Sequence, residues 1–219
     1  AGTGRYLPEK ILTNFDLEKM VDTTDEWIRT RTGVERRHCV APDETTSDMC
    51  VEAAKVAMED AGVKPEDIEM VIIGTTTPDL VFPNAATLVQ HRLGIPSCPC
   101  IATEEACTSF IYGLSIADKF IKAGEVKRVL VIGVECITKL VDWNDRNTCV
   151  LFGDGAGAVV LEASERPGII STHLHADGAY ESLLRVRAGI SKGYKQVQAG
   201  EAFMEMKGNE VFRMAVTTL

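Results

Sequence analysis

The sequence predicts an α/β fold, built on a mainly parallel sheet that helices cover on both faces. Several segments are apolar throughout, and they alternate with segments of helical periodicity that end at glycines. Strands that are apolar on both sides are buried on both faces, which is typical of parallel sheets. The 219 residues are enough for one large domain or two small ones.

The helical segments carry recognisable start and stop signals. Ser47 is expected to cap a helix that runs to Ala61 and ends at Gly62. Asn84 is expected to cap a second helix, which ends near residue 93. Further helices are expected over 108–123 and from 208 onward, and strands over 71–76, 98–102, 128–135, 156–162 and 169–174.

The C-terminal part differs from the rest of the chain. Residues 177–202 are polar and lack periodicity, so a long, partly irregular excursion is expected there. The helix that begins near Gly208 has no stop signal before Leu219. We therefore expect an N-terminal portion of a longer protein. Its expected division is a first half over residues 1–175, and an excursion with the start of a second half over 176–219.

Composition excludes several classes of function. The net charge of −9 argues against non-specific nucleic-acid binding. No apolar run reaches the length of a membrane span, and the N-terminus lacks a signal-peptide pattern, so a cytoplasmic protein is expected. Seven irregularly spaced cysteines do not form a disulfide framework. Cys98 and Cys100 lack zinc-ligand spacing, and neither a metal nor a cofactor is expected.

Cys107 is the sharpest candidate for chemistry. It follows a predicted strand and precedes an amphipathic helix, in the segment EEACTSF. Backbone N–H groups at a helix start favour the thiolate, which is the nucleophilic form of cysteine. On these grounds alone, a buried structural cysteine is the commoner outcome.

A short helix is expected from Thr23 to Gly33, with Thr23 and Glu26 as its capping box. Trp27 and Arg31 lie four residues apart, on one face of that helix. A tryptophan beside an arginine can stack on a nucleobase and bind phosphate. A packed tryptophan beside a solvated arginine is the alternative. Four arginines that could serve an anionic ligand cluster here: Arg29, Arg31, Arg36 and Arg37.

A glycine-rich segment, FGDGAGAVVL over residues 152–161, superficially matches a dinucleotide-binding loop. Such a loop must follow a strand and open a helix. Here the glycines precede a strand, so a nicotinamide site is not predicted.

Seven segments together resemble bacterial β-ketoacyl-acyl carrier protein synthase III over essentially the whole chain. They are GTGRYLPEKILTN, DTTDEWIRTRTGVERRH, GTTTPDLVFPNAA, EEACTSFIYGLSIADKFI, DWNDRNTCVLFGDGAGAVVL, GIISTHLHADG and MKGNEVF. The resemblance implies a thiolase-like fold of αβαβα layers and a homodimer. It also implies an acyltransferase that condenses acyl-coenzyme A, with acetyl as the default primer, with malonyl-acyl carrier protein. The implied products are 3-oxoacyl-acyl carrier protein, carbon dioxide and free coenzyme A.

The resemblance also assigns roles to residues. Cys107 matches the nucleophile, whose N–H supplies part of the oxyanion hole, and Arg213 matches a basic position near the carrier-protein docking surface. Trp27 and Arg146 match the pair that holds adenine. The coenzyme A positions are Thr23, Trp27, Arg31, Thr32, Arg146, Phe152, Met206, Asn209 and Phe212. The acyl-pocket positions are Phe82, Leu184 and Met204, of which Phe82 is expected to reach across the dimer.

Two departures from the family pattern are visible. The family's catalytic histidine and asparagine lie in motifs resembling PHQAN and GNTSAAS, and neither motif occurs in these 219 residues. Glu105, with Glu104 adjacent, stands two residues before Cys107 where the family usually has a small residue, and a carboxylate close to the sulfur would oppose thiolate formation. Two alternatives follow: an incompetent coenzyme A-binding or dimerisation module, or another thiolase-like condensing enzyme.

Overall fold

The computed structural model describes residues 1–166, 168–193 and 195–218. The chain forms two compact units, each assembled from separate stretches of sequence. Unit 1 contains Ala1–Lys10, Val40–Cys136 and Asp154–Leu174. Unit 2 contains Ile11–Cys39, Ile137–Gly153 and His175–Leu219. The expected division of the family halves at residues 175 and 176 stays a prediction.

Unit 1 is built on a five-stranded mixed sheet of order β1-β7-β6-β4-β5. The strands are β1 (Gly2–Tyr6), β4 (Met70–Gly74), β5 (Cys100–Thr103), β6 (Arg128–Glu135) and β7 (Gly155–Glu162). β4 runs parallel to both β5 and β6. β7 runs antiparallel to β6 and to β1. The expected sheet is therefore present, but only its β6-β4-β5 side is parallel.

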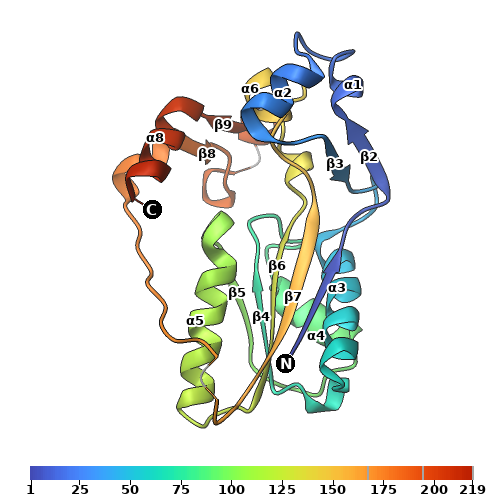
Figure 1. Ribbon diagram of the computed structural model, residues 1–219, viewed down its shortest axis with the longest axis vertical. Helices are drawn as coiled ribbons and strands as arrows, with labels where there is room; N and C mark the ends of the chain where they lie inside the picture. Colours follow the sequence, from blue (N-terminus) through green and yellow to red (C-terminus); the bar gives the residue numbers. More distant parts are fainter. Residues whose placement is uncertain (167, 194, 219) are drawn as a thin grey trace. The chain divides into compact units, whose positions relative to one another are not determined.

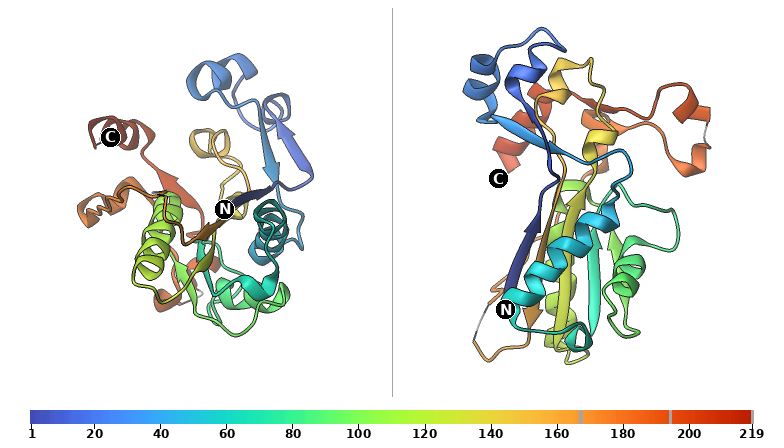
Figure 2. Two further views of the ribbon diagram at one scale, coloured as in Figure 1. Left: turned by 60° about the horizontal axis from the view of Figure 1, so that its bottom comes forward. Right: turned by 90° about the vertical axis from the view of Figure 1, so that its right-hand side faces the viewer.

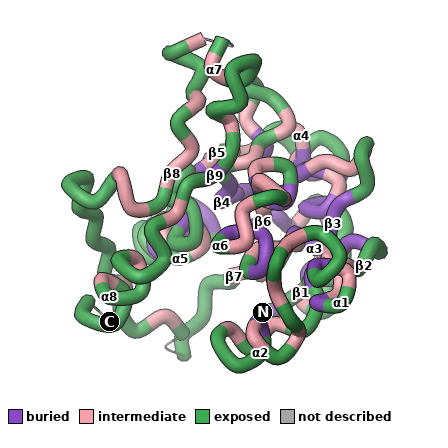
Figure 3. The backbone as a smooth tube through the Cα atoms, turned by 90° about the horizontal axis from the view of Figure 1, so that it is seen from above, coloured by how far each residue is buried: buried purple, intermediate pink, exposed green. Residues whose placement is uncertain are grey.

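Helices cover both faces of this sheet. α3 (Thr46–Ala61) and α4 (Ala85–Arg92) lie on one face, and α5 (Ser109–Lys122) lies on the other (Figures 1 and 2). The buried backbone of unit 1 gathers on the central strands β4 and β6 (Figure 3). All five residues of β4 are buried, which explains why this strand is apolar throughout.

Most expected elements of unit 1 are present, and the differences have local causes. Thr45, rather than Ser47, caps α3, because its hydroxyl accepts from the Asp48 N–H while Asp48 bonds back to the Thr45 N–H. Gly62 ends the helix in the left-handed conformation, with φ of 65°. Asn84 caps α4 as predicted.

One expected strand is wrong. Residues 169–174 contain no strand among the described positions, and Ile170 is 88% exposed. Their apolar pattern was misleading because β1 already occupies the free edge of β7. The Thr172 hydroxyl forms a hydrogen bond with the Ser115 hydroxyl of α5 at 2.9 Å.

Unit 2 consists of short elements around a small apolar cluster. Its helices are α1 (Asn14–Leu17), α2 (Asp25–Thr32), α6 (Arg146–Cys149), α7 (Lys195–Gln198) and α8 (Gly208–Thr218). Its two-stranded sheets pair β2 (Lys10–Thr13) with β3 (Arg36–Cys39), and β8 (Leu184–Val186) with β9 (Met204–Met206). The buried cluster contains Leu17, Ile28, Val141, Cys149, Val150 and Met204.

Two expectations in unit 2 need correction. Thr24, rather than Thr23, caps α2, and its hydroxyl accepts from the Trp27 N–H at 3.1 Å. Gly33 ends that helix as predicted, with φ of 72°. The segment 177–202 is less irregular than expected, since it contains β8, α7 and short 3-10 turns. No helix among the described residues is long and apolar enough to span a bilayer.

Candidate active site

Cys107 lies in a single 3-10 turn, Ala106–Thr108, between the end of β5 and the start of α5. Among the described residues it is the one exposed cysteine. The alternative of a buried structural cysteine therefore does not describe this position. An exposed thiol at the start of a helix is accessible to an acyl donor.

Four of the other cysteines are less suited to nucleophilic chemistry. Burial raises the thiol pKa of Cys50, Cys98 and Cys149, and it raises that of Cys100 to about 11. A raised pKa keeps a thiol protonated near neutral pH, and the thiolate is the attacking species.

The backbone of the turn is strained directly before the candidate nucleophile. Ala106 has φ of 49°, in the left-handed region that residues other than glycine rarely adopt. This conformation costs roughly 1–2 kcal/mol for an L-residue. The backbone N–H and hydroxyl of Thr108 both donate to the Glu105 carbonyl, at 3.1 and 2.8 Å, which holds the turn closed. Nothing in the sequence pattern indicated the conformation of Ala106.

The first residue of α5 packs closely against the end of strand β4. A Cβ added to Gly74, the last residue of β4, would lie 2.5 Å from the Cβ of Ser109. Ser109 is the first residue of α5 and is 1% exposed. A glycine at position 74 thus lets α5 start in contact with the strand, two residues after Cys107.

The two glutamates before Cys107 have solvated side chains. Glu104 and Glu105 are both exposed. The interaction of an exposed carboxylate with a neighbouring charge is weakened by water. The predicted opposition of these glutamates to thiolate formation stays a prediction.

In unit 2, two guanidinium groups lie over one tryptophan. The Cζ atoms of Arg31 and Arg146 are 4.5 and 4.4 Å from the centroid of the Trp27 ring. The structure thus brings together three residues that the family resemblance assigns to coenzyme A. Such cation–π contacts contribute about 0.5–2 kcal/mol each.

Arg146 lies too close to the Trp27 ring to leave room for a base between them. A base between them would make one van der Waals contact with the ring and one with the guanidinium. It would therefore need roughly 7 Å between Arg146 and the Trp27 ring, about twice the ordinary carbon–carbon contact distance. Arg146 also donates to the Asp22 carbonyl at 2.8 Å. A base can enter between Trp27 and Arg146 only if the arginine moves outward.

Two threonines predicted to contact coenzyme A differ in their bonding. The Thr23 Oγ1 atom is buried and has no hydrogen-bond partner among the described residues. The Thr32 hydroxyl donates to the Ile28 carbonyl at 2.7 Å and accepts from the Val34 N–H at 3.0 Å. Thr23 is therefore the better candidate for a direct bond to a ligand.

The remaining predicted positions fall on several elements of unit 2. Phe152 packs against the apolar cluster, and Met204 is buried within it at 7% exposure. Met206 pairs with Leu184 across β8 and β9. Three further residues are exposed on α8: Asn209, Phe212 and Arg213. Their roles stay predictions.

The predicted residues are divided between the units, and the acyl-pocket positions are split, with Phe82 in unit 1 and Leu184 and Met204 in unit 2. All nine coenzyme A positions and Arg213 lie in unit 2, whereas Cys107 and Phe82 lie in unit 1. Phe82 is 83% exposed, next to the exposed Leu80 and Val81. The division assigns the acyl acceptor and the predicted nucleotide contacts to different units.

The arginine cluster is only partly available to an anionic ligand. Arg37 is 3% exposed and is bonded inside unit 2. Arg29 pairs with Asp25 at 3.4 Å and with Glu35 at 3.6 Å. The expectation that all four arginines could serve a ligand is therefore wrong for Arg37, whose side chain folds inward.

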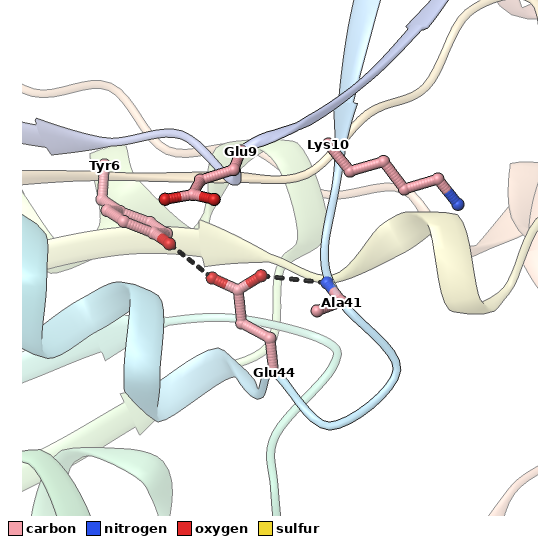
Figure 4. A pocket seen from close by; sticks show the side chains of 5 residues that line it. All are labelled: Tyr6, Glu9, Lys10, Ala41 and Glu44. Atoms are coloured by element: carbon pink, nitrogen blue, oxygen red, sulfur yellow. Dashed lines mark hydrogen bonds between the residues drawn. The ribbon is translucent and has the colours of Figure 1, made fainter.

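Unit 1 also contains a pocket that includes no predicted site residue. It is lined by Tyr6, Glu9, Lys10, Ala41 and Glu44 (Figure 4). The Tyr6 hydroxyl donates to Glu44 at 2.6 Å, and the Ala41 N–H donates to the other carboxylate oxygen at 3.0 Å. The bond to Glu44 is the main cause that raises the pKa of Tyr6 to about 12. The polar groups of Tyr6, Ala41 and Glu44 thus satisfy one another.

Comparison with known proteins identifies the family. Residues 102–178, which include Cys107, match the family described as 3-oxoacyl-acyl carrier protein synthase III. The chain is 60% identical over 218 residues to the β-ketoacyl-acyl carrier protein synthase III of Thioalkalivibrio sulfidiphilus, covering 100% of this chain and 68% of that relative. The chain belongs to the β-ketoacyl-acyl carrier protein synthase III family. The predicted family and its enzyme class, an acyltransferase, are confirmed.

Solved structures of this family and of a related enzyme agree with the fold. The 3-oxoacyl-acyl carrier protein synthase III of Aquifex aeolicus matches with a TM-score of 0.89 and 46% identity, covering 97% of this chain and 65% of that one. A priming β-ketosynthase from the R1128 polyketide pathway matches with a TM-score of 0.92 and 34% identity, covering 99% and 65%. The predicted thiolase-like fold is confirmed. The chain spans about two thirds of the length of these relatives.

Proposed function

We propose that the protein containing this chain condenses an acyl-coenzyme A, by default acetyl-coenzyme A, with malonyl-acyl carrier protein. The products are 3-oxoacyl-acyl carrier protein, carbon dioxide and free coenzyme A, and the reaction starts fatty acid synthesis. The observation that carries this proposal is the exposed Cys107 at the start of α5, within the segment that matches the family. The cytoplasm remains the predicted compartment.

The first half-reaction is acyl transfer. The Cys107 thiolate attacks the carbonyl carbon of the acyl-coenzyme A, and the carbon–sulfur bond to coenzyme A breaks. Coenzyme A leaves as its thiolate, and the acyl group remains on Cys107 as a thioester. The Cys107 N–H is proposed to donate to the carbonyl oxygen, which becomes negative in the tetrahedral intermediate.

The second half-reaction forms the carbon–carbon bond. Malonyl-acyl carrier protein loses carbon dioxide, and its carbanion attacks the Cys107 thioester and releases the thiolate. The family resemblance assigns decarboxylation to a histidine and an asparagine. The four histidines of these 219 residues lie outside the family motif that carries that histidine.

Coenzyme A is proposed to bind through unit 2. Its adenine would stack on Trp27 once Arg146 moves outward, and the unpartnered Thr23 hydroxyl would bond to it. Arg31 lies over the same ring and would meet the phosphates, which a guanidinium binds well. Burial of the base would compensate for the loss of the direct contact between Arg146 and Trp27.

A homodimer is proposed from the exposed apolar loop of unit 1. Leu80, Val81 and Phe82 are 49%, 59% and 83% exposed. The loop is nevertheless anchored, because Glu135 accepts from the Thr76 N–H and the Thr77 hydroxyl, both at 2.8 Å. An ordered apolar loop in water favours association. A second copy would cover it, and Phe82 would then close the acyl pocket of that copy.

Carrier protein is proposed to dock near Arg213. This residue is exposed on α8. An acidic carrier protein is attracted by local positive charge even when the enzyme is net negative. The net charge of −9 therefore does not oppose this partner.

The test is product formation by the whole protein. Purified enzyme is incubated with acetyl-coenzyme A and malonyl-acyl carrier protein, and the carrier protein is analysed by intact mass. A 3-oxobutanoyl adduct with stoichiometric carbon dioxide release is expected. Malonyl-acyl carrier protein that stays unchanged, with enzyme shown to be folded, would contradict the proposal. Parallel rates with acetyl- and isobutyryl-coenzyme A identify the primer.

Two alternatives give different results in the same assay. The likeness to the priming β-ketosynthase favours a condensing enzyme of another pathway as the second candidate. That candidate predicts that acetyl-coenzyme A is not the preferred primer. A binding or dimerisation module predicts coenzyme A binding without an acyl adduct on Cys107.

A further inference from the structure

Arg37 is a buried cation in unit 2 and has no place in the proposed chemistry. It is 3% exposed, on strand β3. Its Nε donates to the Val150 carbonyl at 3.2 Å, and one terminal nitrogen donates to the same oxygen. The other terminal nitrogen donates to the Asn14 amide oxygen at 2.7 Å. Burying a guanidinium is costly unless its N–H groups are bonded. Movement of a partner would leave a buried N–H group unbonded, so these bonds keep the partners in place.

Asn14 extends this set of bonds to both ends of α2. It is 1% exposed and is the first residue of α1. Its amide nitrogen donates to the Asp25 carboxylate and to the Val34 carbonyl, both at 2.8 Å. Asp25 opens α2, and Val34 follows Gly33, which ends it. One buried side chain thus holds the helix that carries Trp27 and Arg31 at its start and beyond its end.

The Val150 carbonyl connects the same set of bonds to α6. Val150 is the C-cap of α6, the four-residue helix whose first residue is Arg146. Arg37 binds the carbonyl at the end of this helix, while Arg146 at its start lies 4.4 Å from the Trp27 ring. α2 and α6 are therefore joined through the hydrogen bonds of Asn14 and Arg37.

We propose that Arg37 and Asn14 are positioning residues for coenzyme A, which set the spacing of Trp27 and Arg146 without touching the ligand. This proposal rests on the proposed function of the stack. It follows from the buried bonds, because a short helix of four residues has little rigidity of its own. When Arg146 moves to admit a base, the bond from Arg37 to Val150 keeps the end of α6 in place.

The test separates positioning from a merely structural role by using two substrates. The variants Asn14→Ala and Arg37→Lys are made in the whole protein; Arg37→Lys retains the buried charge but not the fork that holds two oxygens. KM and kcat are measured with acetyl-coenzyme A and with acetyl-pantetheine, which lacks the adenosine part. A matched control is Thr46→Val, which removes a buried hydrogen-bonding side-chain group from unit 1, at a residue that is 2% exposed.

The expected result is selective. KM for acetyl-coenzyme A rises about tenfold, which is within the range of one or two lost stacking contacts, while kcat and the KM for acetyl-pantetheine stay within about twofold. Thr46→Val moves neither KM. Equal losses with both substrates, or an unchanged KM for acetyl-coenzyme A in both variants, would overturn the proposal.

Direct binding distinguishes this proposal from the proposed function. Titration calorimetry gives Kd for coenzyme A and for pantetheine without any reaction. A wild-type protein that binds coenzyme A tightly but makes no 3-oxoacyl product contradicts the proposed reaction only. In that case the loss of affinity for coenzyme A, but not for pantetheine, in either variant still supports positioning. A wild-type protein that binds both equally weakly contradicts positioning.

Discussion

In unit 1 the candidate nucleophile rests on apolar and close backbone packing, whereas in unit 2 the predicted nucleotide contacts rest on buried polar bonds. Beneath Cys107, Gly74 touches Ser109, and the strand β4 under α5 is wholly buried. The helices that carry Trp27 and Arg146 are bonded by the Asn14 amide and the Arg37 guanidinium.

The difference matches what each unit is proposed to do. A nucleophile needs a fixed backbone turn, and close packing of the turn against a sheet restricts its movement. A stack that must open to admit a base needs helices whose ends stay in place while a side chain moves. Directional hydrogen bonds to helix ends satisfy that need better than apolar contact, because apolar packing is non-directional.

The largest expected effect is at Cys107. Cys107→Ser in the whole protein should abolish the acetyl adduct on incubation with acetyl-coenzyme A, because a serine hydroxyl is a far weaker nucleophile than a thiolate. Intact mass measures the adduct. Cys98→Ser, at a half-buried cysteine of the same unit, should retain it. The Cys107 variant should still bind coenzyme A, since the predicted nucleotide contacts lie in unit 2; an acetyl group on that variant would contradict the assignment.

The next effect is on packing beneath the turn. Gly74→Ala should lower the free energy of unfolding by about 1–3 kcal/mol, because its new Cβ collides with Ser109. Gly157→Ala is the matched control in strand β7, where a Cβ meets nothing within 4 Å. This control should be neutral or stabilising by up to about 1 kcal/mol. Urea denaturation measures both, and equal destabilisation by the two variants would contradict the packing account.

A smaller effect is expected at the stack. Trp27→Ala should raise Kd for coenzyme A about tenfold, because stacking a base on an aromatic ring contributes about 1–3 kcal/mol. Trp143→Phe is the control, since Trp143 packs against the same apolar cluster but has no predicted contact with the ligand. Calorimetry measures both. An unchanged Kd in Trp27→Ala would mean that the stack in unit 2 does not bind adenine.

The smallest effect concerns Glu135, a half-buried carboxylate of unit 1. Desolvation raises the pKa of Glu135 above its ordinary value of 4.5, although the Thr76 and Thr77 bonds act in the opposite direction. A raised folded-state pKa means that the folded protein binds the proton more tightly, so the contribution of Glu135 to stability falls as pH rises above 4.5. Glu135→Gln should lose this pH dependence.

The Glu135 prediction is tested by unfolding at several pH values. The free energy of unfolding of Glu135→Gln relative to wild type should become more favourable as the pH rises through the raised pKa. A relative stability that is flat or changes in the other direction contradicts it. In unit 2 the buried charge is Arg37, whose pKa is lowered by desolvation. An arginine stays protonated under ordinary conditions, so Arg37→Met should show no such titration.

Much of the fold could be predicted because its signals are short-range. β6 was expected over residues 128–135, where it lies, since eight consecutive residues there suit a buried strand. Gly62 and Gly33 end their helices because few other residues adopt the left-handed conformation. The helix starts lie at Thr45 and Thr24 rather than at Ser47 and Thr23, because Thr45 and Thr24 have the extended backbone that lets their hydroxyls accept from the first turn.

By itself, the sequence determined the family, the α/β class and the location of Cys107 between a strand and a helix, because motifs and periodicity are properties of neighbouring residues. The tertiary structure alone decided that Cys107 is exposed, that Ala106 is left-handed and that residues 169–174 are not a strand. It also decided that Arg37 turns inward to a carbonyl 113 residues away. Burial and hydrogen-bond partners are set by segments distant in sequence, and no local pattern records which of them will meet.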